Sequence, residues 1–239
     1  MKKKYWLMGV AGVMVLTSIV GGTWASLNTN TENGVGAGVA EVTTKAIQVA
    51  FAGEKTEKSV LTDADVTPGA FCKYEQSIKN DTTDGYDIYV KVNVYKYWAD
   101  ETTEEQNAVL EEDGSYYAYD ADLNGAYAAL CFGDAQEDYD SVEVGDVTEN
   151  GWLVAYEDEE QITLYYTKPL AAGEQSENFL DGISFSTKMN NAYTGKTLAL
   201  EFEVNAVQAN NSADAIAAEW GVFPTFDADG TIISVSETR

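Results

Sequence analysis

Histidine is absent from all 239 residues of the chain. Its absence excludes the Ser-His-Asp and Cys-His catalytic arrangements in their usual form. It also excludes zinc sites that need imidazole, including the H-E-x-x-H pattern of metallopeptidases. Carboxylate pairs can catalyse glycoside hydrolysis, but with 40 Asp and Glu residues a pair found in the sequence carries no information. Most hydrolase classes are therefore excluded, and we expect a protein that is not an enzyme and needs no cofactor.

Basic residues are also scarce, because 14 Lys and Arg stand against 40 Asp and Glu and the net charge is −26. Proteins bind nucleic acids and anionic lipids largely through Lys and Arg side chains that neutralise phosphates. We therefore exclude nucleic acid and anionic membrane surfaces as partners. So acidic a surface repels other copies of itself, and salt or divalent cations would favour their close approach. The plainer interpretation of the charge is a well-solvated exterior.

Long apolar runs are missing except at the N-terminus, which reads MKKKYWLMGVAGVMVLTSIVGGTWAS. Three lysines precede the uncharged residues 5–20, a stretch shorter than the roughly 20 residues that a membrane-spanning helix needs. Small residues at Thr23 and Ala25 precede Ser26, as they do at the cleavage site of secretory signal peptides. We predict a signal peptide over residues 1–25, cut between Ala25 and Ser26, and no membrane span after cleavage. The alternative is a retained N-terminal anchor.

Cysteine occurs only at positions 72 and 131. Cys72 and Cys131 are an even number in a chain expected to be exported, so a disulfide is one interpretation. It would close a loop of about 60 residues and add roughly 4 kcal/mol by the chain-entropy estimate. The other interpretation is two small, buried hydrophobic side chains. The sequence leaves both open.

Apolar side chains, by contrast, make up 45% of the chain, with 15 Tyr, 8 Phe and 5 Trp. This is too much buriable surface for a disordered protein. Alternating apolar and polar residues, the pattern of a strand with one buried face, recur along the chain. The segments with this pattern are 47–51, 71–80, 86–98, 161–170, 178–186 and 197–209. They predict an all-β fold, an antiparallel β-sandwich.

Within this pattern, Cys72, Tyr74, Gln76 and Ile78 are expected on one face of their strand. Residues 86–98 carry the strongest alternation in the chain, and we expect a strand there with one buried face.

One helix is clear at 211–221, where Asn211 or Ser212 can cap the start and Gly221 can stop it. A second short helix is expected near 126–130, inside a long irregular insertion at 99–151. We also expect a loop over residues 53–69 and a turn at Asp229-Gly230. The chain is thus predicted to hold one β-sandwich domain over 39–239, preceded by a polar, glycine-rich, extended arm at 26–38.

The segment DADLNG copies the start of an EF-hand calcium loop, with Asp120, Asp122 and Asn124 at positions one, three and five. Position twelve is Cys131, where the loop needs a bidentate Glu, so a full EF-hand is excluded. A weak, partly hydrated calcium site is one interpretation and an acidic surface turn is the other. The shorter DADG at 227–230 has the same two interpretations.

Two tyrosine-rich stretches, DGSYYAYDAD at 113–122 and TLYYTK at 163–168, could form a sugar-binding platform or a contact face between copies. Alternating aromatic residues in a sheet more commonly belong to the core and to cross-strand pairs. We favour the structural interpretation.

Several segments, in this order, resemble the TasA and camelysin (CalY-like) family of exported proteins from Gram-positive bacteria. The N-terminal segment KKKYWLMGVAGVMVLTSIVGGTWA, with its late Gly-Gly-Thr, is similar to the export signals that the SipW-type signal peptidase processes. The other segments that carry the resemblance are 30–42, 77–98, 165–185 and 202–221.

The resemblance implies a jelly-roll-like sandwich, secretion, and a role in extracellular fibres or the biofilm matrix at the cell surface. Some relatives assemble by β-augmentation, in which the freed N-terminal segment completes the sheet of a neighbour by donor-strand exchange. The corresponding arm residues here are Ser26, Leu27, Val35 and Val39. Partners would then be copies of the chain or related matrix proteins, besides a SipW-type signal peptidase.

We therefore expect a secreted structural protein that assembles into extracellular fibres. A cell-surface adhesin or binding module is the alternative. Camelysin-like relatives also suggest a surface metallopeptidase, but the lack of histidine and of a zinc motif does not support that activity.

Overall fold

The structure is a computed structural model of the chain, and it describes residues 47, 49–53, 58–61, 66–82, 85–102, 108–110, 116–120, 122–133 and 142–238. The predicted signal peptide, its cleavage site at Ala25 and Ser26, and the arm with Leu27, Val35 and Val39 lie outside these residues. No helix in the described part is long and apolar enough to cross a membrane.

Two antiparallel sheets face each other and enclose one main core, which confirms the expected all-β sandwich. The smaller sheet has the order β1 (Val49–Gly53), β3 (Phe71–Asn80), β10 (Leu180–Phe185) and β7 (Ala128–Cys131). The larger sheet has the order β2 (Lys58–Leu61), β11 (Thr197–Gln208), β4 (Ile88–Thr102), β6 (Tyr116–Tyr119) and β5 (Ala108–Leu110). In the same sheet β9 (Gln161–Tyr166) pairs with β4, and β8 (Trp152–Glu157) pairs with β9.

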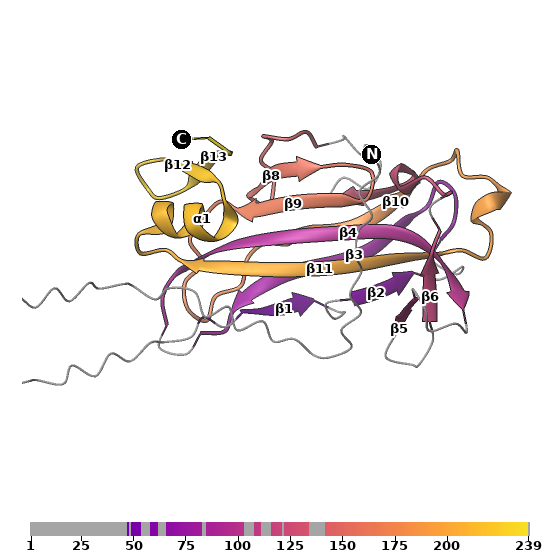
Figure 1. Cartoon of the computed structure of the whole chain (residues 1–239), viewed down its shortest axis with the longest axis horizontal. Helices are drawn as coiled ribbons and strands as arrows, with labels where there is room; N and C mark the ends of the chain where they lie inside the picture. The colour runs from indigo at the N-terminus through magenta and orange to yellow at the C-terminus, as the bar shows by residue number, and fades with distance from the viewer. Residues whose placement is uncertain are drawn as a thin grey trace, which may run out of the picture.

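The long strands follow the alternation seen in the sequence. On β4, the side chains of Ile88, Val90, Val92 and Val94 are fully buried in the core. β4 pairs with β11 along all twelve residues of β11, and the two strands run side by side along the length of the molecule (Figure 1). This long ladder forms the centre of the larger sheet, because every other strand of that sheet pairs with β4 or β11 directly or through one neighbouring strand.

Several short elements differ from the expectations, among them β5 and β6 inside the expected irregular insertion at 99–151, and β8, which was not predicted. Residues 58–61, within the expected loop 53–69, form β2 and pair with β11. The helix expected near 126–130 is instead a single 3-10 turn at Gly125–Tyr127, followed directly by β7. Strands of three or four residues carry too few alternating positions to show a period, so only the sheet partners reveal them.

A second, smaller core lies on the outer face of the larger sheet. There α1 (Ser212–Trp220) and the hairpin of β12 (Phe223–Phe226) and β13 (Ile232–Ser236) pack over residues of β4, β8, β9 and β11 (Figure 1). The predicted helix is confirmed, with Gly221 ending it at a φ of 71°. Asn211 precedes it at a φ of 59° but makes no side-chain capping bond. Gly230, at a φ of 83°, makes the predicted turn between the last two strands.

Candidate functional site

Two of the three side chains of the predicted calcium loop are engaged in other bonds. Asp120 pairs with Lys196 at 2.8 Å and also accepts a hydrogen bond from the backbone N–H of Asp122. The Asn124 side chain accepts from the backbone N–H of Ala126 and so starts the 3-10 turn. Among the described residues, no group of three or more acidic, Cys or His side chains could hold a metal ion. The loop is therefore an acidic turn that its own hydrogen bonds and the ion pair with Lys196 hold in place.

The second acidic turn, at 227–230, is likewise closed on itself. The Asp227 carboxylate accepts hydrogen bonds from the backbone N–H groups of Asp229 and Thr231. These bonds lower the pKa of Asp227 below its ordinary value, the bond from Thr231 contributing most. The carboxylate therefore stabilises the β12–β13 turn.

The disulfide is the interpretation that the structure contradicts, because Cys72 and Cys131 are separate thiols. They lie on β3 and β7, with β10 between them, where Cys72 is opposite Ile183 and Cys131 is opposite Gly182. Two strand spacings of about 4.8 Å exceed the reach of a disulfide. Neighbouring residues of β10 also point to opposite faces, so the two thiols do too. Cys131 is the buried hydrophobic side chain of the alternative interpretation.

The tyrosines of the TLYYTK stretch belong to the two cores. Tyr165 is buried and stacks on Trp220 with ring centroids 5.0 Å apart. Tyr166 is buried on the opposite face, 5.0 Å from the ring of Trp152. Their placement agrees with the structural interpretation. The DGSYYAYDAD stretch contains β6, whose side chains lie outside the described part.

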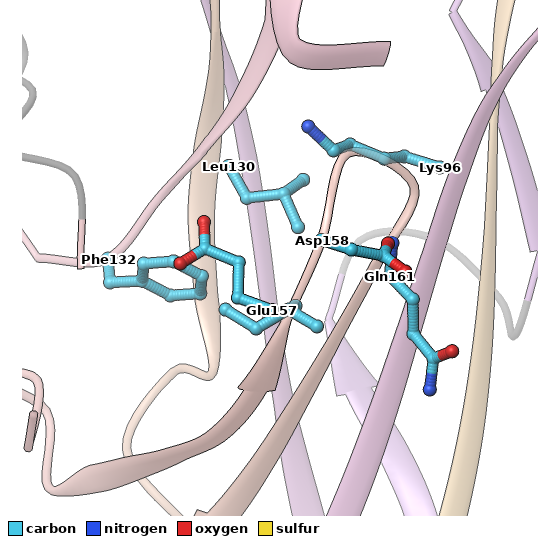
Figure 2. A pocket seen from close by; sticks show the side chains of 7 residues that line it. Lys96, Leu130, Phe132, Glu157, Asp158 and Gln161 are labelled. Carbon is cyan, nitrogen blue, oxygen red and sulfur yellow. The ribbon is translucent and has the colours of Figure 1, made fainter. Parts of the chain in front are cut away.

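A small hollow at one end of the sandwich contains an unusual buried lysine. Lys96 is 8% exposed, and its Nζ donates to the carbonyls of Gly125 at 3.0 Å and Ala128 at 2.6 Å. Burial lowers its pKa to about 8, although the acidic residues Glu157 to Glu160 act in the opposite direction. Figure 2 shows the Lys96 ammonium and the Glu157 carboxylate with Leu130 between them in this view. The hollow measures about 20 Å³, which is room for a water molecule and not for a substrate.

Among the described strands, one edge of the larger sheet is unpaired along most of β11. On one side all of β11 pairs with β4, but on the other side β2 pairs only with residues 198–201. Within the described residues, no strand pairs with 202–208 on that side. Alternate N–H and C=O groups of these seven residues therefore point away from the sheet, and such an edge can template another strand. We call residues 202–208 the β11 edge.

The side chains of the β11 edge alternate between the main core and the outer face, where Val207 belongs to the second core. Phe202 and Val204 are each 6% exposed and, with Ala206, face the main core. Phe202 stacks against Tyr74 of β3 and meets the edge of the Phe179 ring. On the outer face Glu203 accepts a hydrogen bond from Asn93 at 2.9 Å. A strand that pairs with this edge would therefore extend the ladder of the larger sheet.

The smaller sheet has a shorter gap at the corresponding side. β1 pairs only with residues 76–80 of β3, so residues 71–75 have no partner there among the described strands. Lys73 and Glu75 form a salt bridge of 2.9 Å on the solvent face of this gap. Charged side chains, lysine above all, are a common protection of an edge against further pairing. The β11 edge has no lysine and is the better candidate for an incoming strand.

The opposite side of the sandwich is covered by its own chain. Residues 145–148 run along β8, where Gly145 donates to Val154 and Thr148 donates to Trp152, each at 2.8 Å. β7, the end strand of the smaller sheet, has only four residues, and the Ala128 carbonyl already accepts from Lys96. Short or covered edges do not recruit strands. The edges that β7 and β8 form are therefore short or covered, in contrast to the β11 edge.

The amide of Gln76, on the inner face of β3, is the main anomaly of the core. Gln76 is 1% exposed, and within the described part of the chain neither its Nε2 nor its Oε1 has a hydrogen-bond partner. A buried polar group without a partner costs about 1–3 kcal/mol. The sequence pattern placed Gln76 on this face, but only the packing reveals that nothing satisfies it. The signal for it in the sequence was a polar residue among the inward-facing residues of β3.

The chain matches no protein-family model, no curated protein and no solved structure. The candidate site therefore depends on the geometry of this chain alone.

Proposed function

We propose that the chain is a secreted subunit of an extracellular fibre of the biofilm-matrix type, and that it is not an enzyme. In this proposal the segment released by signal-peptide cleavage in one copy pairs with the β11 edge of the next. The open β11 edge is the observation that carries the proposal, because it offers seven residues of backbone and an adjoining apolar face.

The chain supplies a suitable partner for that edge. Residues 26–38, SLNTNTENGVGAG, have no charge other than Glu32 and contain no proline that would block a ladder. Each subunit would then carry one arm and one edge, and a head-to-tail contact of this kind forms an open filament. Cleavage after Ala25 would start assembly, because an arm still joined to the export signal is held at the membrane. The resemblance to TasA-like proteins agrees with this scheme.

The experiment compares the secreted chain beginning at Ser26 with a chain beginning at Val39, by negative-stain electron microscopy at equal concentration. We expect filaments from the first and monomers from the second. A synthetic peptide of residues 26–38 in excess should cap the edge and stop filament growth, whereas a scrambled peptide of the same composition should not. Equal assembly by both chains would exclude the proposed mechanism.

A binding module is the second candidate function, and one groove favours it. The groove lies between the larger sheet and the C-terminal hairpin, measures about 200 Å³, and is lined by Lys91, Tyr156, Thr163, Ser236 and Glu237, among others. Tyr156 is 45% exposed, so its ring could stack on a sugar. A glycan array with monomeric protein tests this candidate. Binding that Tyr156→Ala abolishes and Tyr86→Ala leaves intact would support it.

A further inference from the structure

The groove beside the C-terminal hairpin contains a lysine whose charge has no contacting anion. Lys91 of β4 is half-buried and lines the groove, and its ammonium makes no ion pair or hydrogen bond within the described part of the chain. Glu203 favours the charged form of Lys91, but its carboxylate accepts a hydrogen bond from Asn93 at 2.9 Å. Burial has the larger effect and lowers the pKa of Lys91 below its ordinary value. An anion bound at this place would remove the cost of burying the charge.

Tyr165 supplies a second unused donor in the same groove. It lies directly opposite Lys91 on the neighbouring strand β9, and such residues have Cβ atoms about 5 Å apart. Tyr165 is 2% exposed, lines the groove and stacks on Trp220. Its hydroxyl has no hydrogen-bond partner among the described residues, and burial alone raises its pKa to about 12. The ammonium and the phenol can therefore donate to one ligand.

The other hydroxyls of the groove are already engaged. Thr163 donates to the side-chain oxygen of Asn93 at 2.9 Å, and Ser236 donates to the carbonyl of Thr238 at 2.7 Å. Glu237 lines the groove as well and is exposed, so its carboxylate opposes an anion there. The groove thus holds two adjacent donors that lack an acceptor, and one exposed carboxylate.

The size of the groove and its aromatic wall suit a small ring. Tyr156 is 45% exposed, and its hydroxyl donates to Asp158 at 2.7 Å, which holds the ring in place. A tyrosine ring offers an apolar face on which a sugar ring can stack. The volume of about 200 Å³ equals roughly six or seven water molecules of about 30 Å³ each, which is enough for one sugar ring.

We propose that this groove binds an acidic sugar of the hexuronate class, with its carboxylate on Lys91 and Tyr165 and its ring on Tyr156. This inference rests on the binding module, the second candidate function above, and names the class of its ligand. A carboxylate accepts from both donors at once, and bonds between charged groups are roughly twice as strong as neutral ones. The net charge of −26 repels such a ligand at a distance. Salt screens that repulsion over about 8 Å at physiological ionic strength, whereas the contact with Lys91 is made inside the groove.

The test uses the secreted chain that begins at Ser26, below the concentration at which it assembles, at physiological ionic strength. The probes are glucuronate, glucose and acetate. Glucose has the ring without the carboxylate, and acetate has the carboxylate without the ring. NMR titration measures the three dissociation constants, and we expect glucuronate to bind at least about tenfold more tightly than either of the others, since a charge-assisted bond contributes that much.

Four variants assign the contacts. Lys91→Met keeps the length of the side chain and should weaken glucuronate binding at least about tenfold, with little change for glucose. Tyr165→Phe keeps the ring on Trp220 and should weaken glucuronate binding as well. Glu237→Gln should strengthen it, because a repelling charge is removed. Lys188→Met is the matched control, since Lys188 is exposed on the turn after β10, does not line the groove and carries the same charge.

The outcomes separate this inference from the function beneath it. If glucose binds as tightly as glucuronate, or if Lys91→Met acts no more strongly than Lys188→Met, the inference is wrong, whereas glucose binding would still support the second candidate function. If acetate binds as tightly as glucuronate, the ring makes no contact with Tyr156 and the inference is also wrong. If none of the three probes binds, the second candidate function fails at this groove together with the inference, and the fibre proposal is unaffected.

Discussion

Tyr74 of β3 and Phe202 of β11 stack across the interior of the sandwich, with ring centroids 6.1 Å apart. Each belongs to the part of its strand that the short end strand leaves uncovered, since β1 pairs with residues 76–80 and β2 with residues 198–201. The stacked pair therefore joins the two sheets at the point where both gaps meet. It holds the open side together in the absence of strands from another copy.

Truncation of this pair should destabilise the monomer strongly. Phe202→Ala removes the ring contacts to Tyr74 and Phe179 and leaves a cavity in the main core. We expect a loss of about 3–5 kcal/mol in the free energy of unfolding, measured in urea below the concentration of assembly. Phe223→Ala, a half-buried ring in the C-terminal hairpin, should cost clearly less. Equal losses for the two variants would show that the Phe202 contact does not stabilise the open side.

Stability should rise with pH in the range where Lys96 loses its proton. The pKa of Lys96 is about 8 in the folded chain and 10.5 when unfolded, so between these values the unfolded state binds more protons. Stability therefore increases with pH, by about 2 kcal/mol between pH 8 and pH 10. Urea unfolding at these two pH values measures the rise, and Lys96→Met should lack it. Above pH 10 the buried Tyr165, whose pKa burial raises to about 12, acts in the opposite direction.

The two thiols should behave as independent groups. Burial raises the pKa of Cys131 to about 11, and its side chain is almost inaccessible, so it should not react with a thiol reagent in the native chain. Cys72 is more exposed and should react faster. Mass spectrometry after labelling should show one label in the native chain, and two labels in urea without any reductant. A mass two hydrogens lower, with no label in urea, would indicate the disulfide.

Calcium should have no specific effect on stability through the DADLNG loop. The Asp120 carboxylate is paired with Lys196, which is the main cause of its lowered pKa, and a calcium ion would have to displace that lysine. We expect calcium and magnesium at equal concentration to change the melting temperature equally, through general screening of the negative charge. EDTA should then have no effect. A calcium-specific rise that Asp120→Asn removes would show that the loop binds the ion.

The sequence predicted the elements that are long enough to show a period. β3, β4 and β11 were visible as alternating segments, and α1 through its apolar stripe and Gly221. β2, β5, β6 and β7 were missed because three or four residues show no period, and the six-residue β8 was missed as well. The conformations of β2 and β7 come from pairing with β11 and β10.

Only part of the candidate site could be predicted from the sequence. The arm at 26–38 stays a prediction from composition, because these residues lie outside the described part of the chain. The edge could not be predicted, because whether a strand has one neighbour or two depends on contacts distant in the chain. The same holds for the cysteines, whose even number allowed a disulfide until β10 was found between them.

By itself the sequence determined the fold class, the acidic surface and the absence of imidazole chemistry, because each follows from local patterns or from composition. Only the tertiary structure decided which strand edge is left open, which polar groups are buried without partners, and which acidic residues are already paired. These properties depend on where segments far apart in the chain meet, and the orphan amide of Gln76 is one that no local pattern contains.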